Sequence, residues 1–157
     1  MNMTTGSQPL SPLEQALAGF EDSIDGRKAV LEKFMAARVH VLLDRPWDGR
    51  SLPSTETRML FVSDGENQEQ AMLAVFTDRS RAESVASAMG EFRHAVEVDS
   101  KWALLGVPPA TGVRINPNSE PGFRILPELT AELRKVAQRH LAERQRAAAG
   151  DPAGMAP

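Results

Sequence analysis

The chain has 157 residues, of which 41% are hydrophobic and 25% charged, a composition typical of one soluble globular domain rather than of a disordered or fibrous chain. It contains no cysteine, which excludes disulfides, thiolate metal sites and cysteine nucleophiles. The net charge of −3 argues against non-specific binding to nucleic acid.

The first predicted element is a helix over residues 11–22. Ser11 is suited to the N-cap, Pro12 to the first helical position, and Glu14 to the third, where it completes a capping box. The apolar side of this helix has two possible partners, the core of its own chain or a neighbouring copy. Homo-oligomerisation therefore stays open.

A second helix is predicted over residues 27–37, because Asp25 and Gly26 form a turn signal that should end the first. Its apolar residues recur at helical spacing, which predicts a core-facing stripe of Val30, Leu31 and Phe34.

Three strands should follow, at residues 39–43, 57–63 and 71–77, each a short apolar run. Asp64 and Gly65 are turn residues between the second and third strands. We therefore expect the three strands to form an antiparallel meander.

Helices and strands also alternate in the second half of the chain. Asp78 is expected to cap a helix over residues 79–89, and Gly90 to stop it. The remaining predicted elements are a strand at 95–98, a half-apolar segment at 101–105, strands at 112–115 and 122–126 joined by turn residues, and a helix at 127–146 with an apolar stripe of Leu129, Leu133, Val136, Ala137, His140 and Leu141.

These elements predict an α+β fold: a mostly antiparallel sheet of about five short strands with flanking helices, packed mainly on one face. Residues 10–146 should form the single domain. Residues 1–9 and the low-complexity tail at 147–157 should be disordered.

Three segments in order resemble the N-terminal domain of the SseB family, named for enhanced serine sensitivity. They are VFTD at residues 75–78, WALL at 102–105 and GVRINP at 112–117, and the resemblance covers residues 26–142. The family's role is poorly defined, so the resemblance implies a fold and no catalytic residues.

Trp47 is the leading candidate for binding a partner. It lies between Arg45 and Arg50 in a long loop at 44–56, and tryptophan and arginine contribute more interface energy than their area suggests. Trp47 is equally suited to fold back and cover the sheet.

Thr77, Asp78 and Asn116 lie where two of the predicted strands end and are the candidates for a ligand pocket at the strand ends. Their structural interpretation is that Thr77 or Asp78 caps a helix and that Asn116 forms a turn before Pro117.

Other chemistry has weaker support in the sequence. Phosphate-binding glycine loops and a nucleophile elbow are missing, and no histidine has a second histidine at metal-ligand spacing, so we expect no cofactor and no metal. Glu91 and His94 form a single Glu-x-x-His, and the loop acids Asp44, Asp48 and Glu56 are more simply solvated. Residues 134–157 carry five basic and two acidic side chains without interleaved aromatics, which favours a solvated helix end over nucleic-acid binding.

The function expected from these observations is a non-enzymatic interaction or regulatory module that binds another cytoplasmic protein. The alternative is a small-molecule sensor or weak enzyme with its pocket near Thr77 and Asn116. The first ten residues lack the pattern of a signal peptide, and no apolar run is long enough to span a bilayer, so we expect a cytoplasmic location.

Overall fold

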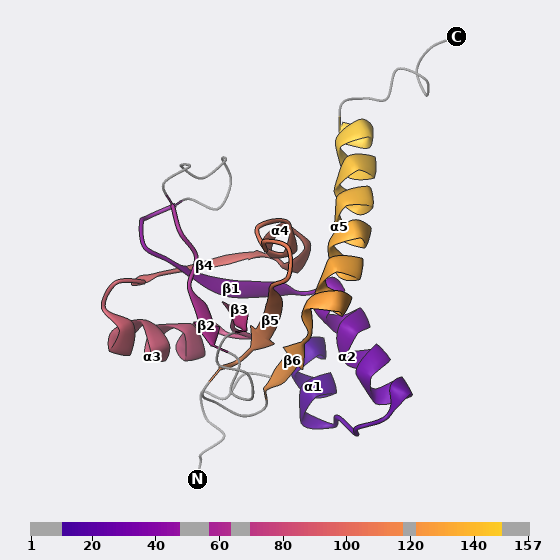
Figure 1. Cartoon of the computed structure of the whole chain (residues 1–157), viewed down its shortest axis with the longest axis horizontal. Helices are drawn as coiled ribbons and strands as arrows, with labels where there is room; N and C mark the ends of the chain where they lie inside the picture. The colour runs from indigo at the N-terminus through magenta and orange to yellow at the C-terminus, as the bar shows by residue number, and fades with distance from the viewer. Residues whose placement is uncertain (1–10, 48–56, 64–69, 118–121, 149–157) are drawn as a thin grey trace.

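A computed structural model describes residues 11–47, 57–63, 70–117 and 122–148, and within them an α+β fold (Figure 1). The predicted disordered start at 1–9, the Asp64-Gly65 turn and most of the predicted tail lie outside these residues. The elements in chain order are α1 (Pro12–Ala18), α2 (Ile24–Met35), β1 (Arg38–Leu43), β2 (Phe61–Ser63), β3 (Ala71–Val75), α3 (Arg79–Met89), β4 (His94–Asp99), α4 (Ser100–Leu105), β5 (Gly112–Ile115), β6 (Phe123–Ile125) and α5 (Pro127–Ala148).

The helix N-termini at α1 and α3 confirm the predicted caps. The Ser11 hydroxyl accepts a hydrogen bond from the backbone N–H of Glu14, and the Glu14 carboxylate accepts one from the backbone N–H of Ser11. The Asp78 carboxylate accepts from the backbone N–H of Arg81, and Gly90 ends α3 with a φ of 70°. Each cap satisfies helix donors that have no partner within the helix.

The predicted break at Asp25 and Gly26 is wrong. Both residues lie in the first turn of α2, because Ser23 is the N-cap and its hydroxyl accepts from the backbone N–H of Gly26. A Cβ on Gly26 would collide with the backbone carbonyl of Glu21. The glycine is therefore needed for close approach of two backbones rather than for a turn.

The strands form two sheets instead of one. A four-stranded sheet has the order β2-β3-β5-β6, and β1 pairs with β4 in a separate antiparallel ladder. The predicted meander is correct for β2 and β3, which pair antiparallel. In the described part of the chain, β1 reaches them through isolated bridges rather than a ladder. β3 and β5 are parallel, a pairing that the sequence did not predict.

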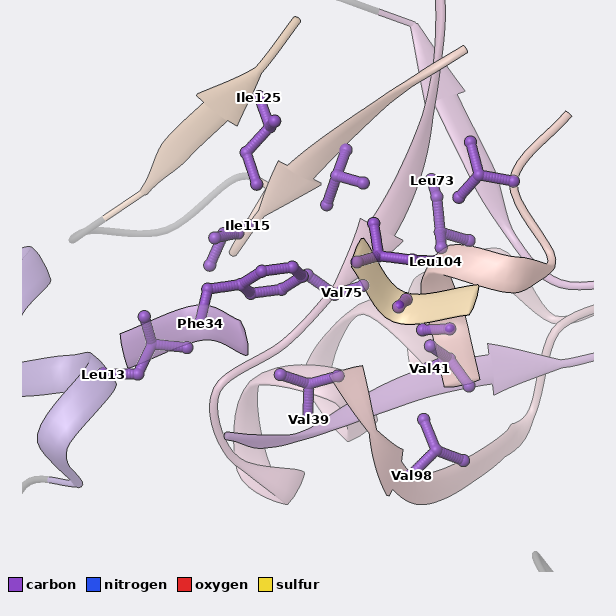
Figure 2. Packing of buried hydrophobic residues seen from close by; sticks show 14 of the residues in the cluster. Leu13, Phe34, Val39, Val41, Leu73, Val75, Val98, Leu104, Ile115 and Ile125 are labelled. Carbon is purple, nitrogen blue, oxygen red and sulfur yellow. The ribbon is translucent and has the colours of Figure 1, made fainter. Parts of the chain in front are cut away.

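Most of the core lies between the sheets and the four helices α1, α2, α4 and α5 (Figure 2). Phe34 of α2 is fully buried among Leu13, Val75 and Ile115 in this cluster. Because Leu13 and Leu17 pack here, α1 covers the core of its own chain. α3 packs in a second, smaller cluster, separate from the main one. Its buried residues are Leu42, Leu60, Ala74, Phe76, Ala82 and Ala86.

The last helix, α5, packs on α4 and β5 and then extends away from the sheets in Figure 1. Its buried residues are Thr130 and Ala137, with Leu133 half-buried, whereas Leu129, Val136 and His140 of the predicted stripe are exposed. The stripe was predicted too wide, because only one side of this long helix has the body of the protein beside it.

Candidate functional site

The residues that follow β3 and β5 are brought together as predicted. The parallel register sets Val75 beside Ile115, so the next residues along each strand are neighbours. The Asn116 Oδ1 accepts from the Thr77 backbone N–H at 3.0 Å, and its Nδ2 donates to the Thr77 hydroxyl oxygen at 3.1 Å. The backbone N–H of Asn116 donates to the carbonyl of Val75 at 2.8 Å.

A carboxylate from α1 completes this strand-end cluster of Glu14, Thr77 and Asn116. The Thr77 hydroxyl is 3.1 Å from Glu14 Oε2, an arrangement in which it donates to the carboxylate while accepting from Asn116. Asn116 is fully buried and has a φ of 54°, a left-handed conformation that asparagine tolerates better than most residues. These bonds tie α1 to both strand ends.

Asp78, the third residue predicted for the strand-end pocket, is half-buried at the N-cap of α3. It also forms an ion pair with Arg81 at 3.2 Å. The structural interpretation of Asp78 is therefore confirmed, while ligand binding at Thr77 and Asn116 stays a prediction.

Trp47 lies on Trp102 of α4. The two rings stack with centroids 4.7 Å apart and an angle of 20° between their planes. Both residues are half-buried and pack against the main core cluster. Arg45, two residues before Trp47 in the sequence, is exposed. Arg50 lies outside the described residues, as do the loop acids Asp48 and Glu56. Partner binding by Trp47, Arg45 and Arg50 stays a prediction.

A cavity of about 560 Å³ lies at the edge strand β6, and sequence reasoning missed it. Phe20 and Leu31 contribute to it from the α1–α2 side, and Phe123, Leu126 and Leu129 from β6 and the start of α5. Phe20 and Phe123 meet edge to face, with ring centroids 5.3 Å apart. No local motif marks such a cavity, because its walls are distant in the chain. The sequence signal that could have indicated it is an arginine among the apolar residues of each of the predicted strands at 112–115 and 122–126.

Among the residues that the structure describes, His40 and Asp44 have shifted pKa values. Burial lowers the pKa of His40 below its ordinary value, and its Nδ1 atom is buried without a hydrogen-bond partner. The backbone N–H of Arg58 donates to Asp44 at 2.8 Å and lowers the pKa of that carboxyl. This direction opposes use of Asp44 as a general acid, which requires a raised pKa.

The other polar candidates have structural partners. Glu91 forms an ion pair with Arg58 at 3.0 Å and lies beyond α3, so it does not share a helix face with His94 of β4. Within the described residues, no three carboxylates or histidines gather as a metal site would require. Three residues of the basic end have partners: Arg134 with the Val107 carbonyl, Lys135 with Glu132, and Arg144 with Asp99.

Comparison with known proteins identifies one family. Residues 13–132 match the family described as SseB protein N-terminal domain. No curated protein and no solved structure matches the chain. Among the helices that the structure describes, none is both long and apolar enough to cross a membrane.

Proposed function

This chain belongs to the SseB family, and we propose that it acts as a non-enzymatic interaction module that binds another cytoplasmic protein. The observation that carries the proposal is the stack of Trp47 on Trp102. Both tryptophans of the chain lie in this one place, and each keeps part of its surface in contact with solvent. We call this pair, together with Arg45, the tryptophan surface.

The tryptophan surface has the composition of an interface hot spot. Tryptophan and arginine dominate the residues whose truncation weakens protein complexes most. Trp102 belongs to α4, whose N-cap Asp99 and buried Ala103 and Leu104 hold it against the core. A ring that is already stacked loses little conformational freedom on binding, which favours affinity.

Several polar groups among the described residues hold the fold itself together. The strand-end cluster, the helix caps and Asp44 each hold other parts of the chain together. This use of polar groups supports a binding role in preference to catalysis at these residues.

Affinity capture of the tagged protein from lysate of its native host tests the proposal. We expect a partner to be retained by the wild type, weakened in Arg45→Ala and lost in Trp47→Ala. Ile24→Ala removes an apolar side chain that is 86% exposed on α2 and is the matched control, expected to retain the partner. Thermal melting followed by circular dichroism checks that each variant is folded.

Titration of the purified partner then gives the magnitude. Loss of a hot-spot tryptophan costs at least about 2 kcal/mol of binding free energy, roughly a thirtyfold weaker Kd. If Trp47→Ala unfolds the domain, Arg45→Ala still tests the surface, because Arg45 is exposed and outside the stack. Equal retention of the partner by wild type, Arg45→Ala and a folded Trp47→Ala would contradict the proposal.

A second candidate function is small-molecule sensing, predicted near Thr77 and Asn116. There the side chains bind one another and Glu14, so a ligand would have to displace hydrogen bonds of the fold. The cavity at β6 makes no such demand and is the better place for a ligand.

A further inference from the structure

The cavity at β6 combines apolar walls with arginines from two neighbouring strands. Arg114 of β5 and Arg124 of β6 line it together with Phe123 and Leu129. In Figure 1 this region lies where β6 passes beside the α1–α2 pair and runs into α5. Its volume of about 560 Å³ falls within the range of small-molecule sites, which are mostly apolar with a few polar groups that set orientation.

The two arginines face each other across the strands. Arg114 and Arg124 are directly paired in the antiparallel register of β5 and β6. Like charges at opposed positions destabilise a sheet, because their side chains start only about 5 Å apart. An anion beside the Arg114 guanidinium would reduce this repulsion.

Arg114 is the group that most needs such an anion. It is half-buried, and the described part of the chain provides no hydrogen bond or ion pair for its guanidinium. Arg27, the third arginine of the cavity, is already held by Asp22 at 2.6 and 3.0 Å. The remaining acid of the lining is Glu128, which is exposed.

We propose that this cavity binds a small carboxylate that carries an apolar body. The guanidinium of Arg114 offers a planar fork of donors that matches the two oxygens of a carboxylate, and the paired Arg124 adds positive charge. The apolar part of the ligand would contact apolar residues of the lining such as Leu126 and Leu129. This site is separate from the tryptophan surface and does not depend on the interaction that we propose there.

Isothermal titration with two pairs of probes tests the charge requirement. Hexanoate and phenylacetate should bind, whereas hexanamide and phenylacetamide, with the same shape and no charge, should bind at least about tenfold more weakly. The backbone N–H resonances of Gly122 and Phe123 should shift in NMR spectra when either carboxylate is added, because these residues line the cavity.

Three variants locate the binding. Arg114→Gln should weaken carboxylate binding about tenfold or more, because a hydrogen bond to a charged group is lost. Glu128→Gln should strengthen it, because a like charge leaves the lining. Arg139→Gln removes an exposed arginine of α5 that is not part of the lining and is the matched control, expected to bind as the wild type does.

Three outcomes would overturn the proposal: amides that bind as tightly as the carboxylates, an Arg114→Gln variant with unchanged affinity, or no heat and no resonance shift with either carboxylate at 10 mM. Circular dichroism of each variant establishes that it is folded before binding is compared. If Arg114→Gln does not fold, the comparison of carboxylates with amides and the sign of the Glu128→Gln effect still decide the question.

Discussion

Replacing Asn116 with alanine removes the side chain that joins the ends of β3 and β5. The Thr77 backbone N–H loses the acceptor that it now has at 3.0 Å, and the Thr77 hydroxyl loses the donor at 3.1 Å. The hydroxyl keeps Glu14 as an acceptor. Among the described residues the backbone N–H has no second acceptor, so it becomes the main source of the loss.

Two terms set the size of the effect. A buried donor left without an acceptor costs about 1–3 kcal/mol. Alanine at a φ of 54° costs roughly 1 kcal/mol more, because its Cβ crowds the following carbonyl in the left-handed region. We therefore expect Asn116→Ala to lower the free energy of unfolding by about 2–4 kcal/mol, and the melting temperature by roughly 5–15 °C.

Urea denaturation followed by circular dichroism measures the change. Asn116→Gly separates the two terms, because glycine removes the same side chain but adopts a positive φ without steric cost. It should be less destabilised than Asn116→Ala. Ser87→Ala, an exposed substitution on α3, is the control and should stay within about 0.5 kcal/mol of the wild type. An Asn116→Ala variant as stable as that control would refute the reasoning.

Three further changes have expected outcomes. Gly112→Ala should destabilise by about 1–3 kcal/mol in urea denaturation, because the new Cβ would meet the Ile125 carbonyl and approach the sulfur of Met72 to 2.8 Å; wild-type stability would contradict this close packing. Asp78→Ala should cost about 1 kcal/mol by loss of the α3 cap, and Asp78→Asn, which can still accept the hydrogen bond, should cost less. His40 has a folded-state pKa below its unfolded value of about 6.5, so its neutral form stabilises the fold above that pH and the contribution is lost as the pH falls below it. The loss of stability between pH 7.5 and 5.5 should therefore be smaller in His40→Gln than in the wild type, and an equal loss would show that His40 does not titrate in this way.

The local features of the fold could be predicted because they depend on neighbouring residues. The caps at Ser11 and Asp78 depend on a side chain and a backbone N–H three residues away, and both helices begin where these residues indicate. The same argument explains the error at Asp25 and Gly26. A turn signal was given more weight than Ser23, which caps the helix that contains them.

The pairing of strands could not be predicted from local pattern. β3 is bordered by β2, which follows from the chain order, but its other neighbour is β5, about 40 residues later. An apolar strand of five residues is compatible with either a parallel or an antiparallel partner. The choice depends on how the intervening α3, β4 and α4 cross between them.

The candidate sites also differ in how far they could be predicted from local sequence. The sequence placed Thr77 and Asn116 at strand ends, and the parallel register brings them into contact. Trp47 was open to two interpretations, and its stacking on Trp102 depended on a residue 55 positions away. The cavity at β6 draws its walls from both ends of the domain, so no single segment could indicate it.

The long-range pairing of β1 with β4 and of β3 with β5 has a consequence for the order in which the chain folds. As the protein emerges from the ribosome, β2 and β3 can meet early and form isolated bridges with β1. The ladder partner of β1 is missing until residues 94–99 have appeared, and the second ladder partner of β3 until residues 112–115 have appeared. Non-local contacts of this kind slow folding, because loops must close before any contact stabilises them. The nascent first half should therefore remain open to proteases and chaperones until β5 and the core residues of β6 and α5 are made.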